Sequence, residues 1–385
     1  MIESMRIEIS EEDLRDLADR LARTRWPGDF ANDDWSYGVP EPYLRQLVTY
    51  WLDEFDWRAQ EAAMNEFSHK RTEVSGVPIH FVHEPGRGPN PIPVILSHGW
   101  PWTFWDYRHV IRPLADPASY GGDPADAFDV IVPSLPGYVF SSPLDMQGVG
   151  FVRTAEMWSV LMRDALGYAR YGVAGGDSGA FVSAHMAHAF AEQVIGCYLS
   201  FPALLTYDYY GISPEDFVGQ PDGWYERSLF GQLTGRAHMG THIDDPQTLS
   251  YAMVDSPVGQ ASWMLERRRA WSDCDGNVEK RFSKDDLITS FALYWLTRSF
   301  STAVRFYAES FREPWKPVHT RTPTLQAPTG IAAFPKELAL VPRPLAQQHA
   351  NLVHYTVMPK GGHFAPAEEP ELYVEDIRAF FRKLR

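Results

Sequence analysis

Two neighbouring side chains able to act as nucleophiles, Asp177 and Ser178, lie in the glycine-rich stretch GVAGGDSGAF. This stretch is typical of the sharp strand-to-helix turn, the nucleophile elbow, in which small residues flank the attacking side chain. If Ser178 is central, one flanking residue is Ala180, whereas Gly175 and Gly179 flank Asp177. The spacing favours the aspartate but leaves both nucleophiles open.

The two nucleophiles imply different substrates. A serine attacks an ester and passes its proton to a histidine, which leaves an acyl-enzyme. A carboxylate is already ionised near neutral pH, so it needs no base for its first step. If it opens a strained three-membered cyclic ether, it forms an alkyl ester that histidine-activated water can cleave. A serine opening the same ring would leave a stable ether and no route to turnover.

The elements that position these side chains are predicted from short apolar runs that start near residue 72. The runs IHFVH, IPVILSHG, FDVIVPS and YGVAGG have the length and composition of strands buried on both faces of a parallel sheet. Residues 153–168 and 180–194 have helical patterns and follow two of these runs. The alternation of strand and helix predicts right-handed crossovers and an α/β fold.

Four groups of polar residues follow predicted strands, where the reactive side chains of an open α/β sheet lie. They are His98-Gly99-Trp100-Pro101, Asp177 with Ser178, Glu337, and His363. The chain order of nucleophile, acid and histidine is that of α/β-hydrolases. It excludes the chymotrypsin type, in which the histidine precedes the serine.

We therefore predict an α/β-hydrolase fold with two additions. Residues 205–315 interrupt the alternation with aromatic, helical and loop-rich stretches, which indicates a helical lid. Residues 1–75 are expected to form an N-terminal helical meander that packs on core and lid, with helices over 11–24 and 42–66. The hydrolase core then comprises residues 76–204 and 316–385.

Composition limits the partners. The 385 residues carry a formal net charge of −15, which argues against non-specific binding to nucleic acid or to anionic membranes. The charged N-terminus has no signal-peptide pattern, and we expect no membrane anchor. With only two cysteines, Cys197 and Cys274, no disulfide framework is implied, and a cytoplasmic location is the expectation.

Several stretches together resemble the microsomal-type epoxide hydrolases over nearly the whole chain. They are TRWP (24–27), WRAQEAAMNEF (57–67), HGWP (98–101), GGDSG (175–179), DSPVG (255–259), YWLTRSFSTAVRFYAES (294–310), AFPKE (333–337) and GGHFAPAEEPE (361–371). The first two are similar to that family's N-terminal extension. The combination is specific, although any one stretch alone is not.

The resemblance implies hydrolysis of an epoxide to a vicinal diol through an ester on the enzyme, with no metal or organic cofactor. The expected reactants are a small-molecule epoxide and water. The roles it implies are the nucleophile Asp177, the base His363, the orienting acid Glu337, the proton donor Tyr307, and an oxyanion hole formed by the backbone N–H groups of Trp100 and Ser178.

One expected residue is missing. The family uses a second lid tyrosine in a G-Y-x-H stretch, but here Gly235-Arg236-Ala237-His238 has an arginine at that place. Arg236 can stabilise an alkoxide by its charge but is a poor proton donor. His238 or Tyr251 are possible substitutes. We therefore place Arg236 and His238, together with residues 98–101, in the expected substrate pocket.

Two further patterns favour ordinary structural roles. In HMGTH, His238 and His242 are spaced like metal ligands, but the third ligand and the glutamate of the zincin pattern are missing, so we interpret the stretch as a polar lid loop. The basic run LERRRAW (265–271) is interpreted as a solvated helix face. The aromatic residues of the lid fit ordinary core packing and also a largely apolar substrate, aromatic ones included.

Three alternatives stay open at this point: a Ser178 esterase, a haloalkane dehalogenase that uses Asp177, and a weakly catalytic binding protein, the last suggested by Arg236. Detoxification, secondary metabolism and lipid degradation are all compatible roles. The sequence is also compatible with a homodimer.

Overall fold

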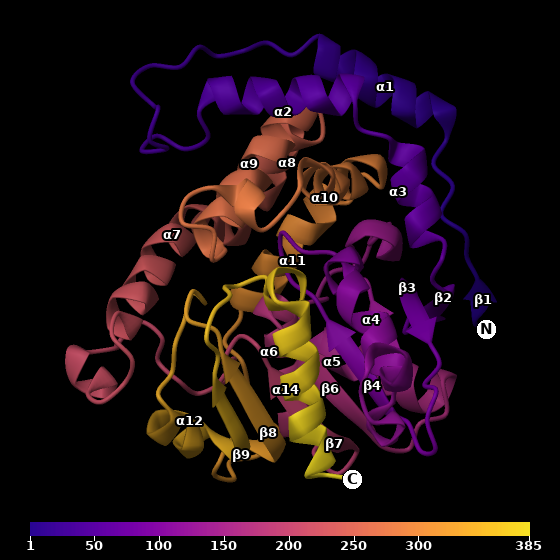
Figure 1. The fold of residues 1–385 in the computed structure, drawn as a ribbon, viewed down its shortest axis with the longest axis vertical. Coiled ribbons are helices and arrows are strands. Elements are labelled where there is room, and N and C mark those ends of the chain that lie inside the picture. The colour runs from indigo at the N-terminus through magenta and orange to yellow at the C-terminus, as the bar shows by residue number, and fades with distance from the viewer.

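A nine-stranded, mostly parallel sheet forms the centre of the computed structural model, which describes residues 1–385 (Figure 1). The strand order is β1-β2-β3-β5-β4-β6-β7-β8-β9. The strands are β1 (Glu3–Ser4), β2 (His69–Val74), β3 (Val77–Glu84), β4 (Ile92–Ser97), β5 (Phe128–Pro133), β6 (Tyr171–Gly175), β7 (Val194–Leu199), β8 (Leu325–Ala333) and β9 (Ala350–Val357). This architecture confirms the predicted α/β class.

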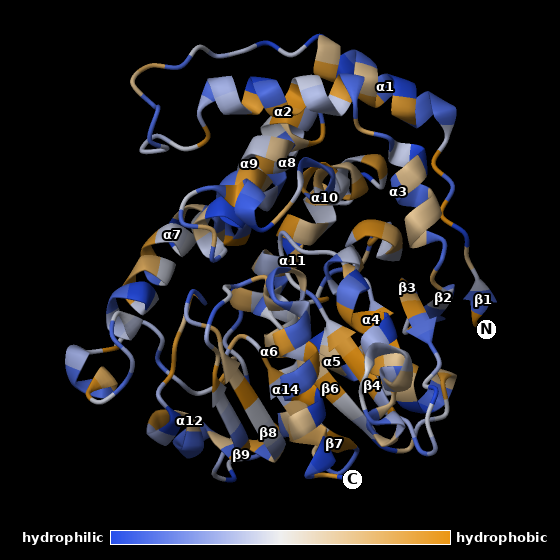
Figure 2. Ribbon diagram, viewed as in Figure 1, coloured by the Kyte–Doolittle hydropathy of each residue, from blue (hydrophilic) through white to orange (hydrophobic).

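The strands that the apolar runs predict are buried on both faces. In β6 every residue is buried, and in β4 and β5 all but one are. Figure 2 shows these central strands as largely hydrophobic. Two features were not predicted. One is the strand β7. The other is the antiparallel side of the sheet, where β1 pairs with β2, β2 pairs with β3, and β3 pairs with β5. Strand β2 lies between β1 and β3 and has both buried and exposed residues, so its sequence lacks the continuous apolar run of a strand buried on both faces.

Helices cover both faces of the sheet. On one face α14 packs on α4, and its Phe380 and Phe381 lie so close to glycines of β6, β7 and β8 that a Cβ there would clash. On the other face α5 packs on α6. The helices of this core are α4 (Arg108–Ala115), α5 (Phe151–Val160), α6 (Asp177–Ala189), α12 (Arg343–His349), α13 (Ala365–Glu368) and α14 (Pro370–Arg382).

The N-terminal segment contributes three helices and part of the sheet. Its helices are α1 (Glu11–Ala22), α2 (Glu41–Asp53) and α3 (Trp57–Met64). The single helix expected over 42–66 is therefore wrong: it is broken where Asp56 accepts a hydrogen bond from the N–H of Ala59 and caps α3. The expected boundary at residue 75 falls in the turn between β2 and β3.

The segment between β7 and β8 is helical and lies across the end of the sheet (Figure 1). We call residues 205–315 the lid. Its helices are α7 (Trp224–Asp244), α8 (Pro246–Met253), α9 (Pro257–Trp271), α10 (Lys284–Leu296) and α11 (Phe300–Phe311). One continuous hydrophobic core joins the N-terminal helices, the sheet and the lid. None of the helices combines the length and the apolar character that a membrane crossing requires.

Candidate active site

The sharp turn between β6 and α6 presents Asp177, whose φ of 49° lies in the left-handed region. A non-glycine residue there stores backbone strain of about 1–3 kcal/mol, and such residues cluster at functional sites. A Cβ on Gly175 would lie 2.4 Å from the backbone of Gly179, and a Cβ on Gly179 would lie 2.0 Å from the carbonyl oxygen of Ser97. Backbone atoms thus crowd both positions that flank the aspartate. The positions that flank Ser178 are Gly176, where an added Cβ would meet the side chains of Trp102 and Ser200, and Ala180, which already carries a Cβ.

The Asp177 carboxylate is held by backbone N–H groups. Trp100 donates its N–H to Oδ1 at 3.0 Å. Gly99 permits this contact, because a Cβ there would lie 2.1 Å from the same oxygen. Burial alone would raise the pKa of Asp177, but His363 and the backbone N–H groups of Trp100 and Ser178 outweigh it and lower the pKa below its usual value. The side chain is therefore ionised at neutral pH.

His363 lies between two carboxylates. Its Nδ1 is 2.6 Å from Oε1 of Glu337, and its Nε2 is 3.1 Å from Oδ2 of Asp177. Burial would lower the pKa of His363, but the charge of Glu337 and the hydrogen bonds to both carboxylates raise it to about 9. In the resting protein Asp177 and His363 thus form a buried ion pair. Ser178 makes no hydrogen bond to His363.

Backbone contacts fix the loops that carry Glu337 and His363. The N–H of His363 donates to the carbonyl oxygen of Trp271 at 3.0 Å, which links this loop to the end of α9. Arg227 of α7 donates from Nε to the carbonyl oxygen of Glu337, also at 3.0 Å. The sequence analysis missed Arg227, because nothing in its local pattern connects it with a loop more than one hundred residues away.

A cavity of about 190 Å³ opens beside the Asp177 carboxylate. Residues of α6, α7 and α11 contribute to it, together with the loops after β7 and β8. Its apolar wall is formed by Phe151, Phe181, Phe201, Tyr209, Met239, Trp271, Phe311 and Leu338. An aromatic wall next to a buried carboxylate suits an apolar ligand with one reactive polar group.

Tyr307 and His238 are polar groups of the lid that line this cavity. The hydroxyl of Tyr307 is buried beside the Ser178 side chain, and no protein group is placed with good hydrogen-bond geometry to it. Burial and the negative charge of Asp177 raise the pKa of Tyr307 well above its usual value, so the hydroxyl keeps its proton. The ring of Tyr307 lies 6.4 Å from that of Trp100, centroid to centroid.

Residues 98–101 support the nucleophile from behind and are not among the residues that line the cavity, which corrects the expected pocket. His98 bonds through Nδ1 to the carbonyl oxygen of Gly99 and accepts the N–H of Leu135 at Nε2. Burial lowers the pKa of His98 to about 4, so the ring is neutral. The ring of Trp100 is buried beneath His238. The carbonyl oxygen of Pro101 accepts a hydrogen bond from Arg268.

The expected role of Arg236 in the pocket is wrong, and so is the loop expected for HMGTH. Arg236 is exposed, as is Tyr251, and neither lines the cavity. His238 and His242 lie instead near the C-terminal end of the long helix α7. Both are buried and pack on Trp100 and Tyr307. The helical spacing of i and i+4 places both rings on the inner face and turns Arg236 outward.

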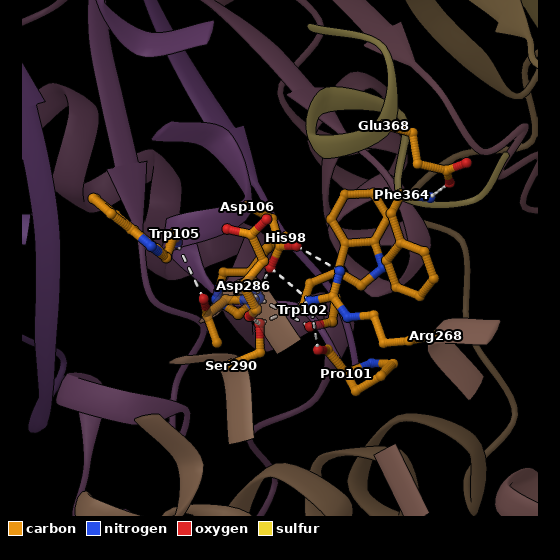
Figure 3. A network of polar contacts seen from close by, with 12 residues as sticks. His98, Pro101, Trp102, Trp105, Asp106, Arg268, Asp286, Ser290, Phe364 and Glu368 are labelled. Carbon is orange, nitrogen blue, oxygen red and sulfur yellow. Dashed lines mark hydrogen bonds and ion pairs between the residues drawn. The ribbon is translucent and has the colours of Figure 1, made fainter. Parts of the chain in front are cut away.

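The basic run 265–271 is not a solvated face, because two of its three arginines are buried. Arg268 donates to both carboxylate oxygens of Asp106, at 2.6 and 3.0 Å, and stacks over Phe364 (Figure 3). Asp106 follows the HGWP loop, and Phe364 follows His363. Arg268 therefore joins the lid to both loops that carry the site.

The fold and the elbow define an α/β-hydrolase, and the family model of the alpha/beta hydrolase fold matches residues 92–298. A second model, the epoxide hydrolase N terminus, matches residues 2–107. The chain belongs to the epoxide hydrolase family.

Relatives and solved structures agree with this assignment. The chain is 34% identical to epoxide hydrolase 1 of Oryctolagus cuniculus, over 98% of this chain and 88% of that protein. It is 32% identical to juvenile hormone epoxide hydrolase 2 of Ctenocephalides felis, over 98% and 85%. The structure of Aspergillus niger epoxide hydrolase superposes with a TM-score of 0.86 at 28% identity, over 100% of this chain and 97% of that one. Juvenile hormone epoxide hydrolase from Bombyx mori gives a TM-score of 0.86 at 27% identity, over 100% and 95%.

Proposed function

We propose that the protein hydrolyses an apolar epoxide to a vicinal diol through an alkyl ester on Asp177. The observation that carries the proposal is that Asp177, and not Ser178, pairs with His363, with 3.1 Å between Oδ2 and Nε2, at the edge of an aromatic cavity. An ionised carboxylate opens a three-membered ether without a base, whereas an ester substrate would require the serine to be paired with the histidine.

In the first step Oδ2 of Asp177 attacks a ring carbon. Oδ1 is the oxygen that accepts the N–H of Trp100, so it becomes the carbonyl oxygen of the ester. The carbon–oxygen bond of the epoxide breaks, and its electron pair stays on the ring oxygen. Tyr307 donates its proton to that oxygen and becomes a phenolate. Its buried, unpartnered hydroxyl supports this role.

In the second step the Tyr307 phenolate takes the proton that His363 carries in the resting protein. The neutral His363 then takes a proton from water, and the hydroxide attacks the ester carbonyl carbon. The backbone N–H groups of Trp100 and Ser178 stabilise the negative charge that develops on Oδ1. Glu337 holds the ring and stabilises the imidazolium, as the 2.6 Å contact to Nδ1 supports. The ester bond breaks and the diol leaves, and the resting state returns with Tyr307 protonated and the Asp177 carboxylate paired with protonated His363, so that protons and charges balance.

The aromatic cavity wall supports an aryl-substituted or other apolar epoxide as the substrate class. The proposal also includes a cytoplasmic location, which is supported by two unpaired, buried cysteines, Cys197 and Cys274. Fractionation of the source cells tests the location.

One turnover in heavy-oxygen water, with enzyme in excess over styrene oxide, tests the reaction. If Asp177 attacks, the first diol carries an unlabelled oxygen from the carboxylate, and mass spectrometry finds the label on Asp177. Asp177→Ala should abolish diol formation, whereas the matched change Ser178→Ala keeps the backbone N–H and should retain it. An adduct on Ser178, or turnover of a nitrophenyl ester or a chloroalkane but of no epoxide, would overturn the proposal.

A further inference from the structure

Two polar side chains without protein partners face the same cavity from different lid helices. The Tyr307 hydroxyl comes from α11 and the His238 imidazole from α7, with ring centroids 5.6 Å apart. Nδ1 of His238 is buried and unpartnered. Buried polar groups are almost always hydrogen-bonded, so two unpaired groups at one cavity call for a ligand atom that satisfies both.

The protonation state of His238 defines what it can offer. Burial lowers its pKa well below the usual value, and the nearby His242, Arg267 and His363 add to this effect. A neutral imidazole carries one N–H, which is a hydrogen-bond donor. The ring therefore presents a donor without a charge, and the natural complement is an oxygen acceptor on an apolar ligand.

The packing around His238 fixes where this donor lies. Its ring stacks on that of Trp100 at 5.5 Å and 15° and contacts Trp271 at 4.9 Å. Trp100 is the residue whose backbone N–H holds Asp177. One turn earlier on α7, Gly235 also lines the cavity, and a Cβ there would lie 4.0 Å from Cε1 of His238. The imidazole thus lies over the nucleophile's loop, beside Tyr307.

We propose that His238 is a second catalytic residue, which donates a hydrogen bond to the epoxide oxygen while Tyr307 protonates that oxygen. This inference rests on the proposed function. As Asp177 forms its bond to carbon and the carbon–oxygen bond breaks, the electron pair moves to the oxygen, the Tyr307 proton follows, and His238 keeps its own proton. The second hydrogen bond lowers the barrier of ester formation only, because no charge develops at that oxygen during ester hydrolysis.

Two neighbours provide the comparison. His242, the next ring on α7, accepts the indole N–H of Trp263 at Nε2. Its Nδ1 is also buried and unpartnered, but the ring does not line the cavity. Trp271 does line the cavity and has an unpartnered indole N–H, but it packs on His363 at 5.2 Å, on the side of the base. The indole N–H of Trp271 is therefore the alternative to His238 as the donor to the epoxide oxygen.

Rapid-quench single turnover of styrene oxide separates ester formation from ester hydrolysis. His238→Met keeps the approximate volume but has no donor, and we expect it to slow ester formation by about 10- to 100-fold, the range for a hydrogen bond to a charged group. Ester hydrolysis should stay within about threefold, since that step does not use the donor. His238→Gln keeps a donor and should recover much of the rate, and the control His242→Gln should change both steps equally.

The outcomes separate the two proposals. If wild-type protein forms no ester on Asp177, the proposed function fails. If wild-type protein forms it and His238→Met forms it within twofold of the same rate, or if only Trp271→Phe slows ester formation selectively, the role of His238 is refuted. If His238→Met does not fold, nitrogen NMR of the histidines in the wild-type protein is the test, with benzamide as the added ligand. The carbonyl oxygen of benzamide should accept the His238 hydrogen bond and shift the His238 resonance. An unchanged resonance refutes the role.

Discussion

At the scale of single residues, the coupling of Asp177 to His363 determines when each step can run. Both side chains are buried, and each stabilises the charged form of the other. In the resting protein His363 is protonated up to about pH 9, which suits the first step because the nucleophile must be an anion. A protonated His363 cannot accept a proton from water, so the second step requires its pKa to fall.

Esterification of Asp177 should cause that fall. It removes one of the two negative charges that raise the pKa of His363 to about 9, so the ring loses its proton at lower pH and becomes a base near neutrality. We expect NMR titration to give a lower pKa for His363 in Asp177→Asn than in wild-type protein. The rate of ester hydrolysis should rise with pH with a midpoint below 9. Equal His363 pKa values in the two proteins would contradict this coupling.

At the scale of elements, the site depends on how closely the loop after β4 approaches the elbow. The contact between Trp100 and Asp177 exists because Gly99 has no side chain. The long helix α7 contributes from the other side: Arg227 holds the acid loop, and His238 reaches the cavity about three turns later. One helix therefore links the position of Glu337 with the wall of the cavity.

Gly99→Ala should damage catalysis far more than stability. The new Cβ would lie 2.1 Å from Oδ1 of Asp177, so the carboxylate must move, and a displacement of about 1 Å costs about 100-fold in rate. Rapid-quench measurement of ester formation checks this. The matched control is Gly240→Ala on the exposed face of α7, where no atom lies within 4 Å of the added Cβ.

Gly240→Ala should leave the rate of ester formation unchanged and stabilise the protein by about 0.5–1 kcal/mol, the helix preference of alanine over glycine. Urea denaturation measures the stability of both variants. Ester formation that is as fast in Gly99→Ala as in wild-type protein would show that the close approach is not required.

At the scale of the whole molecule, the lid is joined to the core by a few polar contacts across an apolar interface. The Arg268–Asp106 ion pair is almost fully buried, with side-chain exposures of 2% and 5%. The N-terminal helix α1 adds exposed contacts to the lid, such as Arg20 to Asp255 at 2.8 Å. Burial decides which of these contacts stabilises the assembly of lid and core.

Arg268→Ala should destabilise the protein by about 3–5 kcal/mol, because it leaves the Asp106 carboxylate buried and unpaired. Arg20→Ala should cost no more than about 1 kcal/mol, since water screens an exposed pair. Urea denaturation of the two variants gives the comparison. Similar losses in both would show that Arg268 contributes no more than a surface pair. Arg268→Ala should also slow both catalytic steps, because the arginine contacts both loops of the site.

The sequence by itself determined those features of the protein that depend on neighbouring residues and on the order of residues along the chain. Apolar runs predicted the central strands because a strand buried on both faces has no polar positions to spare. The glycines around Asp177 marked the turn because only small residues fit there. Asp177, Glu337 and His363 could be assigned to the site because each follows a predicted strand, in the chain order of an α/β-hydrolase.

Only the tertiary structure decided which faces of the lid helices point inward. Arg236 and His238 are two residues apart on α7, so the packing partner alone determines which one meets the cavity. Arg268 is buried because Asp106, 162 residues earlier in the chain, pairs with it. A local sequence pattern cannot reveal a partner that lies far away in the chain. Burying a charged side chain that has no partner costs so much free energy that a surface position is the reasonable prediction for Arg268.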